Sequence, residues 1–553
     1  MNSFRGNVWA RIGHPLFLSA LLILLLAGVM QRAIRETRKA DAEPGFAMDD
    51  AWIHATMARN LISGKGYGIN AGEWIPLSTA PAWTLLLAVC MTAIRQPVAA
   101  GMFAAFLCQA AAMILMYFLC LRLTRHRFWS LVPPILMMLN PILLWGFASG
   151  MELPIVALAV TLCLFVFDRT EPDSRGRIYG LPLALLLGAM SRPELFVLAP
   201  LGLLATAYQN FRRGGGRHRI ARVFGTQSLV YLVGVLPYFL FNLATTGHPF
   251  PTAFVVKFGL RDAGLFAALA QGDWGRVTTM VTRDSVEELY DVIRVFLSHN
   301  LLLVLLAPLG LITFLKPFRE KEKGLSALLV SITLVLPLIL GIVSPTDKLS
   351  NYANRYMAPH VPGLALMGGL GLWAIWNHCR HRMAALLCLI LVAVAARATF
   401  KPTLQMYGRD VRNTNELYVE SGQWLRDHLD PALPIGINDI GGISFFIENK
   451  VIDVMGLATP EIWPLLRNTS RDGYRTPERA QAIADFLRAR NVEYLVISPK
   501  YYPELVRSPE IFEPVRTWNS PFATGRLISP QILYRIHWPA ARAAEEADRR
   551  QNP

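Results

Sequence analysis

Long apolar runs separated by short polar segments dominate the first 400 residues of this 553-residue chain. Runs such as 15–30 and 98–121 are long enough to cross the hydrocarbon core of a bilayer as helices. The pattern predicts spans near residues 15–33, 98–121, 129–148, 152–168, 178–190, 194–210, 224–244, 298–316, 325–344, 356–376 and 383–400. The sequence therefore predicts a polytopic α-helical membrane protein.

Two apolar segments need a separate interpretation. No small-residue cleavage site follows the run at 15–30, so we interpret it as a retained helix rather than a cleaved leader. The segment 79–94 is only about sixteen residues long, which is short for a crossing. A full crossing there would also invert every later loop. We therefore interpret 79–94 as an interfacial or re-entrant element.

The composition supports a membrane protein, since 53% of the residues are hydrophobic, 17% are charged and the mean hydropathy is +0.36. The net charge of +15 comes from basic loops, which is typical of the cytoplasmic side of membrane proteins rather than of nucleic-acid binding. These clusters lie at residues 122–127, 169–177, 212–222, 316–323 and 380–382. We expect about eleven crossings, a cytoplasmic N-terminus and an extracytoplasmic C-terminus. The expected location is the cytoplasmic (inner) membrane of a bacterium.

Three regions follow one another along the chain. Residues 1–400 are expected to form the membrane domain, with a large first outer loop at 34–78. Residues 401–540 predict a soluble extracytoplasmic α/β domain, and the charged tail 541–553 is predicted to be disordered. The expected elements of the soluble domain are helices at 413–429 and after Thr476-Pro477 and strands at 434–437 and 492–498. The six cysteines lie in or beside apolar runs, so they indicate neither a disulfide framework nor a metal motif.

The first outer loop carries two adjacent acids, Asp49 and Asp50, at the start of a short amphipathic helix. Apolar residues recur after them at helical spacing, and Gly64 is expected to end the helix. Acids in a first turn also cap free N–H groups and complement the helix dipole, so a purely structural role stays open. Two adjacent acids at a membrane surface are nevertheless costly to bury, which makes them catalytic candidates.

Other charged residues fall on the same predicted outer side, although they come from separate loops. They are Arg59, Glu152, Arg192, Glu194, Lys257 and Arg355. Helix capping, snorkelling and interface anchoring are alternative roles, while ionisable groups near membrane depth are functional candidates. A carboxylate that accepts a hydroxyl proton, beside cations that stabilise a departing phosphate, suits attack on a sugar attached to a phosphate. In a membrane, we expect a lipid to carry that phosphate.

Several motifs in the same order resemble the GT-C glycosyltransferases, and most closely the terminal arabinofuranosyltransferases of cell-wall arabinan synthesis. The first loop carries Asp49-Asp50-Ala-Trp-Ile, Gly64-Lys-Gly-Tyr-Gly and Thr79-Ala-Pro-Ala-Trp. The later motifs are Ser149-Gly-Met-Glu152, Arg192-Pro-Glu194, Pro251-Thr252 with Lys257, Arg355-Tyr356, Asn438-Asp439-Ile-Gly441-Gly442 and Asp453-Val-Met-Gly456. Where the family has an acidic residue, Gly and Tyr before its Thr-Ser-Pro-Leu-Trp stretch, this chain has Pro76-Leu77-Ser78, which leaves the sugar open.

The resemblance implies a polyprenyl-phosphate sugar donor, inversion at the anomeric carbon and Asp49 as the general base. We expect Asp50 to join Asp49 as a catalytic residue, and the other outer charged residues named above to bind the substrate and its phosphate. Arabinofuranose is the sugar that the resemblance suggests, and a glycan, a lipid or a protein is the expected acceptor. A divalent cation, Mg²⁺ or Ca²⁺, held by Asp49, Asp50 and Glu152 is an alternative to Arg and Lys acting alone.

Two other classes of protein stay open. A transporter or flippase for lipid-linked sugars would show inverted repeats and broken helices, and the sequence shows neither clearly. A membrane scaffold that binds a partner through its tail would leave the paired acids and the outer cations without a role. Release of free polyprenyl phosphate from a lipid-phosphate sugar is expected of the enzyme alone. In that case we expect residues 401–540 to be an accessory domain that binds or guides the acceptor.

Overall fold

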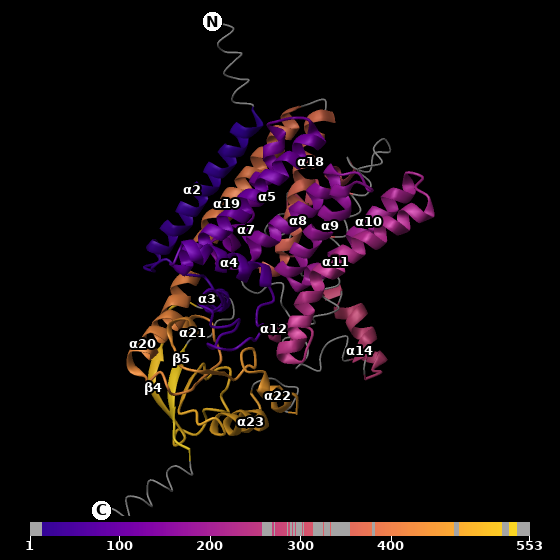
Figure 1. Ribbon diagram of the computed structural model, residues 1–553. Coiled ribbons are helices and arrows are strands. Elements are labelled where there is room, and N and C mark those ends of the chain that lie inside the picture. Colours follow the sequence, from indigo (N-terminus) through magenta and orange to yellow (C-terminus); the bar gives the residue numbers. More distant parts are fainter. Residues whose placement is uncertain are drawn as a thin grey trace, which may run out of the picture.

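The computed structural model describes residues 14–256, 268–269, 271–284, 286–287, 290, 294, 301, 303–312, 325, 332, 354–378, 382–468, 475–522 and 530–538. Figure 1 shows a bundle of long helices with a smaller α/β domain at its lower end. The helix α3 (Asp49–Ile62) of the first outer loop lies between the bundle and that domain. The two predicted catalytic acids therefore lie at the junction of the two parts.

The bundle consists of helices that follow the predicted apolar runs. They are α2 (Pro15–Lys39), α4 (Pro81–Ala93), α5 (Pro97–Thr124), α6 (Val132–Leu139), α7 (Pro141–Ala148), α8 (Leu153–Arg169), α9 (Arg175–Ser191), α10 (Leu198–Arg212), α11 (Arg217–Thr246), α18 (Val361–His378) and α19 (Arg382–Thr414). Shorter elements are η1 (Trp129–Leu131), η2 (Pro193–Val197), α12 (Thr252–Phe254), α14 (Trp274–Thr279), η4 (Met280–Asp284) and η6 (Arg355–His360).

Five of the described helices are long and apolar enough to cross a membrane, and a bent helix pair would make a sixth. This composition, together with the helical bundle, makes the chain a polytopic α-helical membrane protein. The structure describes residues 301 and 303–312 of the predicted span 298–316, and only residues 325 and 332 of the predicted span 325–344. The count of about eleven crossings therefore stays a prediction.

One predicted span, 129–148, is broken in the middle. The helices α6 and α7 meet at an angle of 64°, and the break falls at Asn140-Pro141. Pro141 begins α7 because proline lacks an N–H group and cannot extend the preceding helix. The Asn140 side chain caps α7 by accepting a hydrogen bond from the Ile142 amide at 3.0 Å. Two short helices thus replace the predicted continuous one.

The short helix α4 covers the segment predicted to be interfacial or re-entrant. Its 13 residues extend about 20 Å, which is less than the hydrocarbon core of about 30 Å. The interfacial or re-entrant placement of 79–94 stays a prediction. His54 of α3 and Thr84 of α4 hydrogen-bond at 2.8 Å inside the protein, so α4 fixes α3 against the bundle.

Ion pairs join the basic loops at the end of the bundle away from the C-terminal domain. Arg122 at the end of α5 pairs with Asp168 of α8 at 3.0 Å, and Arg213 after α10 pairs with Glu171 in the turn after α8. The other end of α5 lies against the first outer loop, since Gly101 packs on the Phe46 ring. The basic turns between α8 and α9 and between α10 and α11 therefore lie at one end of the bundle.

The helix α19 joins the bundle to the C-terminal domain without a break. It continues through η7 (Asn415–Val419) into α20 (Glu420–His428), so one helix of 46 residues runs from Met383 to His428. The predicted boundary at residue 400 falls inside this helix, because the change in composition marks the end of the lipid-facing surface and not the end of the helix. Beyond it, Tyr407 and Val411 still pack in the core of the bundle.

The C-terminal domain contains one five-stranded mixed sheet of order β2-β1-β3-β5-β4. Its strands are β1 (Ile435–Ile437), β2 (Val451–Asp453), β3 (Tyr494–Ile497), β4 (Phe512–Trp518) and β5 (Gln531–Ile536). Its other helices are α21 (Gly442–Phe446), η8 (Pro460–Ile462), α22 (Trp463–Asn468) and α23 (Pro477–Arg488). β2, β1 and β3 are parallel, whereas β5 and β4 are antiparallel to their neighbours. The strands expected at 434–437 and 492–498 are β1 and β3, and Thr476 caps α23 as expected.

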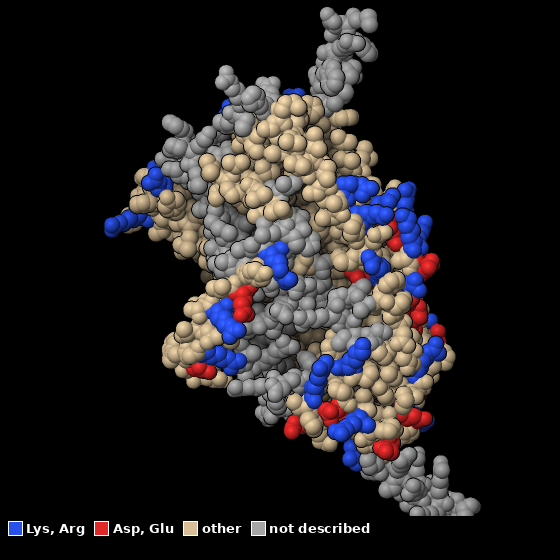
Figure 2. All heavy atoms as spheres, turned by 180° about the vertical axis from the view of Figure 1, so that it is seen from behind, with Lys and Arg blue, Asp and Glu red and all other residues tan. Residues whose placement is uncertain are grey.

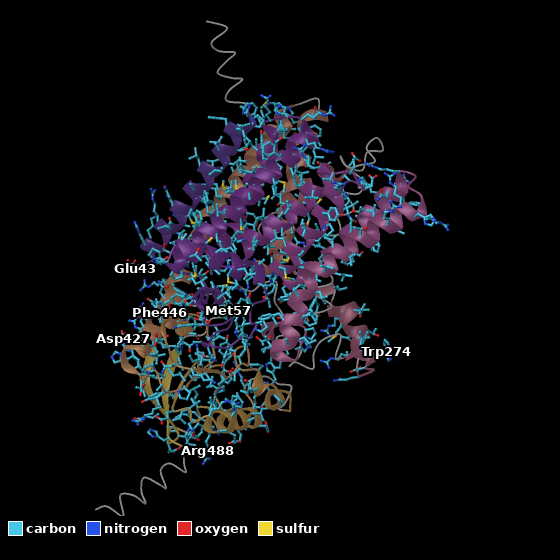
Figure 3. The ribbon with its side chains drawn as sticks, viewed as in Figure 1. Glu43, Met57, Trp274, Asp427, Phe446 and Arg488 are labelled. Carbon is cyan, nitrogen blue, oxygen red and sulfur yellow. The ribbon has the colours of Figure 1, made fainter. Side chains whose placement is uncertain are left out.

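The first outer loop shares a hydrophobic core with the C-terminal domain. Met57, Tyr67 and Leu77 of the loop pack in one buried cluster with Ile437 of β1. Figure 3 shows Met57 of α3 and Phe446 of α21 at this junction. Asn70 adds a reciprocal pair of hydrogen bonds, since its side chain accepts from the Val451 amide at 2.8 Å and donates to the Val451 carbonyl at 3.1 Å. The loop and the domain therefore form one folded unit.

Candidate active site

The helix α3 begins with both acids and directs them to different neighbours. Asp49 is buried, with 7% of its surface exposed, and faces the C-terminal domain. The side chain of Asp50 is 41% exposed and faces Arg355 of η6. Neighbouring positions on an α-helix point about 100° apart, which is why the two carboxylates meet different partners.

Two backbone amides of the C-terminal domain hold the Asp49 carboxylate. Its Oδ2 accepts a hydrogen bond from the Gly441 amide at 2.9 Å, and its Oδ1 accepts one from the Gly442 amide at 2.7 Å. A Cβ atom added at Gly441 would lie 2.0 Å from the Asp49 carbonyl oxygen, so the approach requires glycine at that position. The sequence motif Asn438-Asp439-Ile-Gly441-Gly442 thus forms part of the site around Asp49.

Burial and the neighbouring carboxyl group of Asp439 raise the pKa of Asp49 to about 8, although the Gly441 and Gly442 amides lower it. Asp439 is also buried, which raises its pKa to about 6, and it accepts hydrogen bonds from Gln531 Nε2 at 2.9 Å and the Tyr418 hydroxyl at 3.2 Å. Burial therefore outweighs the effect of the helix dipole, which favours the ionised form of an acid in the first turn. The acid that perturbs it most is Asp439 rather than Asp50.

Two arginines and one tyrosine connect the remaining predicted residues. Arg355 pairs with Asp50 at 3.0 Å and donates to the Met48 sulfur at 3.4 Å. The Tyr356 ring lies 5.4 Å from the Arg355 guanidinium carbon and 4.6 Å from that of Arg192. Tyr356 thus lies between the two arginines and joins them into one cluster.

Arg192 directly precedes η2 and binds two carboxylates at once. It pairs with Glu194 at 2.6 Å and also with Glu152 at the start of α8. The Glu152 side chain is almost fully buried, and its second oxygen has no hydrogen-bond partner within the described part of the chain. Asp50, Glu152, Glu194, Arg192 and Arg355 together carry a formal charge of −1. A phosphate entering this cluster would therefore need additional positive charge nearby.

Of the predicted phosphate ligands, Arg59 does not join this cluster. Arg59 instead donates to the Phe445 carbonyl and lies 4.6 Å above the Phe445 ring, so it binds α21 of the C-terminal domain. Partial burial lowers the pKa of Arg59. Lys257 lies outside the described residues. Glu152, Arg192, Glu194 and Arg355, by contrast, lie in one cluster with Asp50.

The proposed metal ligands do not converge on one point. Asp49 faces two amides, Asp50 faces Arg355 and Glu152 faces Arg192. Among the residues that the structure describes, no three His, Cys, Asp or Glu side chains are placed to hold a metal ion. These three carboxylates therefore do not fit a shared Mg²⁺ or Ca²⁺ site in this arrangement.

An apolar pocket lies among four helices of the bundle. It has a volume of about 390 Å³ and is lined by Ala82 and Leu86 of α4, Leu107 and Cys108 of α5, Ile155 and Leu158 of α8, and Leu187 of α9. Ile155 is one helical turn from Glu152, and Leu187 precedes Arg192 by five residues. Two of its lining residues are therefore within about two helical turns, along the chain, of residues in the charged cluster.

Sequence reasoning assigned no role to three participants in this site. Tyr356 was noted only as the neighbour of Arg355, although an aromatic ring beside Arg is a recognisable cation–π signal. Asp439 and Gly441 follow β1 directly, and the carboxyl ends of parallel strands are where α/β domains usually place functional loops. That positional rule would have identified both residues.

The fold is similar to those of several solved membrane-protein structures. The chain is similar to ArnT from Cupriavidus metallidurans bound to undecaprenyl phosphate, with a TM-score of 0.57, 12% sequence identity, and coverage of 93% of this chain and 97% of ArnT. It is also similar to the apo oligosaccharyltransferase of Archaeoglobus fulgidus, with a TM-score of 0.54, 13% identity, and coverage of 94% and 74%. The fold is therefore that of the GT-C membrane glycosyltransferases, as the resemblance in sequence implies.

Other comparisons are less informative about the reaction. Residues 405–544 match a family described as "Domain of unknown function (DUF8728)". No significant match was found among curated proteins. Arabinofuranosyltransferase AftD from Mycobacteria is similar with a TM-score of 0.42 over 41% of its own chain, which is too weak to decide the sugar.

Proposed function

We propose that this protein transfers a sugar from a polyprenyl-phosphate donor to a hydroxyl group of an extracytoplasmic acceptor. The observation that carries the proposal is the pair Asp49–Asp50 beside the cluster of Arg192, Tyr356 and Arg355, next to an apolar pocket. This combination offers a proton acceptor, cations for a leaving phosphate and space for an isoprenoid chain. The GT-C fold supports the same reaction class.

In the proposed step, the acceptor oxygen attacks the anomeric carbon as the bond between that carbon and the phosphate oxygen breaks. The sugar is inverted, polyprenyl phosphate leaves, and the acceptor proton passes to Asp49. A pKa of about 8 suits this role, because a general base works best when its pKa lies near the operating pH. The carboxylate keeps free lone pairs beside the two amide hydrogen bonds, so it can still accept that proton.

Arg192 and Arg355 are the proposed ligands of the donor phosphate. Since the described cluster carries a formal charge of −1, we assign the additional cation that a phosphate requires to Lys257. A divalent cation at the buried oxygen of Glu152 is the alternative for this one position. The apolar pocket between α4, α5, α8 and α9 would hold the first isoprenoid units of the donor.

Arabinofuranose is the proposed sugar, and a glycan, lipid or protein is the proposed acceptor. We further propose a bacterial inner membrane with the C-terminal domain on the extracytoplasmic side. The domain is assigned more than an accessory role, because Gly441 and Gly442 hold the proposed base. Its loop 438–442 would then border the acceptor site.

The test is release of polyprenyl phosphate by the full-length protein in detergent with decaprenyl-phosphoryl arabinofuranose. Stoichiometric formation of free decaprenyl phosphate and a glycosylated acceptor is expected, and Asp49→Asn should lose both. A protein that moves the intact lipid between leaflets of a vesicle without cleaving it would be a flippase, and the proposal would be wrong. Donors with other sugars, compared side by side, decide the sugar separately from the reaction.

A further inference from the structure

Exposed basic side chains form one continuous surface on α2 and α19, near the C-terminal domain. They are Arg32, Arg35, Arg38, Lys39, Arg397, Lys401 and Arg409, which we name the α2–α19 basic face. Figure 2 shows Lys and Arg gathered along one edge of the molecule, at the height of the lower half of α2 in Figure 1. Spacings of three or four residues keep these side chains on one side of each helix.

The two helices lie side by side, so their charges form one surface. A Cβ atom added at Gly408 of α19 would lie 2.6 Å from the Glu36 carbonyl oxygen of α2. The Ala40 carbonyl oxygen, just after α2, accepts a hydrogen bond from Arg412 at 3.1 Å. Lys401 and Arg409 on α19 are therefore on the same surface as Arg35 and Arg38 on α2.

Carboxylates within the protein neutralise only part of this surface. Buried Glu36 pairs with Arg32 at 3.3 Å and with Lys39 at 2.8 Å. The other five have no carboxylate partner within the described ranges: Arg35, Arg38, Arg397, Lys401 and Arg409. An unneutralised set of cations on one surface attracts anions from outside the protein.

Membrane orientation does not explain these charges. The loops at 169–177 and 212–222 lie at the end of α5 marked by Arg122, whereas Gly101 marks the end near the first outer loop. The two positions are separated along α5 by about 30 Å, the thickness of the hydrocarbon core. Basic residues that set orientation concentrate on one side of a membrane, so the α2–α19 basic face calls for another role.

The same helices expose apolar side chains next to the basic ones. Leu21 and Leu24 on α2 and Ile390 and Val394 on α19 are all more than one third exposed, as expected of residues that face lipid chains. We propose that the α2–α19 basic face binds the phosphate headgroups of anionic phospholipids whose acyl chains lie along these apolar surfaces. This inference does not depend on the sugar, the acceptor or the reaction.

A local reporter on Gln405 tests the proposal in the full-length protein. Gln405 is exposed on α19, one turn from both Lys401 and Arg409. A Gln405→Cys variant, with Cys379 and Cys388 replaced by Ala, carries a fluorophore in vesicles of phosphatidylcholine. Quenching of the fluorophore by nitroxide-labelled phosphatidylglycerol is compared with quenching by nitroxide-labelled phosphatidylcholine at the same low mole fraction.

Labelled phosphatidylglycerol is expected to quench the fluorophore about fivefold more efficiently than labelled phosphatidylcholine. This factor corresponds to the attraction of about 1 kcal/mol between one basic side chain and an anionic headgroup. Replacing Arg35, Arg38, Arg397 and Lys401 by Gln should bring the ratio of the two quenching efficiencies to about one, as should high salt. The matched control replaces four exposed arginines of the opposite end, Arg175, Arg212, Arg217 and Arg222, and should leave the ratio unchanged.

Equal quenching by both lipids in the protein with the native basic residues would overturn the proposal. A ratio of quenching efficiencies that stays near five at high salt would do so as well. A variant that fails to insert would also lose quenching by phosphatidylcholine, so misfolding is distinguishable. Undecaprenyl phosphate is included as a competitor at equal mole fraction. Preference for that lipid over phosphatidylglycerol would assign the face to the sugar donor and contradict the proposal.

Discussion

Asp49 is the residue whose replacement should change both the rate and its dependence on pH. Asp49→Asn keeps the size of the side chain and one oxygen that accepts from the Gly441 or Gly442 amide, while its NH2 group faces the other amide N–H, so folding is measured beside the rate. The variant removes the proton acceptor, and loss of a general base typically costs about 10²–10⁴-fold in rate. Donor binding should be largely kept, because Arg192 and Arg355 do not contact Asp49 in the described structure.

The pKa determines the direction of the pH effect. With a pKa of about 8 for Asp49, the base form is about 1% of the protein at pH 6 and about one half at pH 8. Transfer at limiting acceptor should therefore rise about tenfold per pH unit below neutrality and level off above about pH 8.5. A carboxyl with an ordinary pKa near 4 would give a flat profile over this range.

The assay is the initial rate of polyprenyl phosphate release between pH 5.5 and 9, with thermal unfolding followed in parallel. The Asp50→Asn variant should have a lower rate of transfer, but its rate should rise with pH as steeply as that of the wild type. Asp439→Asn removes the carboxyl group that raises the pKa of Asp49 most and should move the midpoint of the pH profile to lower pH, whereas Asp427→Asn, at an exposed surface position, should not. A flat wild-type profile refutes the assignment of Asp49, and loss of the slope only in Asp50→Asn transfers the role to Asp50.

Three further predictions concern neighbours of the acid pair. Arg355→Gln should reduce transfer about tenfold or more, since a hydrogen bond to a charged group contributes roughly 1.5–3 kcal/mol, while exposed Arg409→Gln should not; an unchanged rate in Arg355→Gln would place the phosphate elsewhere. Gly441→Ala should expel the loop from Asp49, lowering both the rate and the resistance of the C-terminal domain to proteolysis. Gly28→Ala, where nothing lies within 4 Å, is its control, and equal behaviour of the two would contradict the steric argument. Asn70→Ala loses both hydrogen bonds to Val451 and should lower the free energy of unfolding by about 1–3 kcal/mol; an unaltered melting temperature would show that the loop and domain are not coupled.

Local patterns in the sequence were sufficient for the elements next to Asp49. Apolar spacing predicts α3, and the glycine expected to end it, Gly64, has a φ of +68° just after the helix. The sequence also contains a signal for the break between α6 and α7, because the dipeptide Asn140-Pro141 favours a turn. The hydrophobic pattern nevertheless predicts one continuous span there, since the apolar run passes through both residues.

Contacts between distant parts of the chain could not be predicted in this way. Asp49 and Gly441 are 392 residues apart, and neither has a local pattern that names the other. The strand β2 has three residues, which is too short for an alternating pattern to appear. The composition change near residue 400 was real, but it reports which surface faces lipid. It carries no information about whether a helix continues through the boundary.

The adjacent acids connect two parts of the protein that the sequence treats as separate domains. Because positions on a helix turn by about 100° per residue, one helix can present Asp49 to the C-terminal domain and Asp50 to the arginine of η6. Any shift of the loop 438–442 would therefore move α3, and with it the distance between Asp50 and Arg355. Tyr407 and Val411 fix the start of the same domain in the core of the bundle. Removing residues from 405 onward would consequently disrupt the membrane part as well as the site, so point changes at Gly441 and Asp439 are the way to separate acceptor binding from folding.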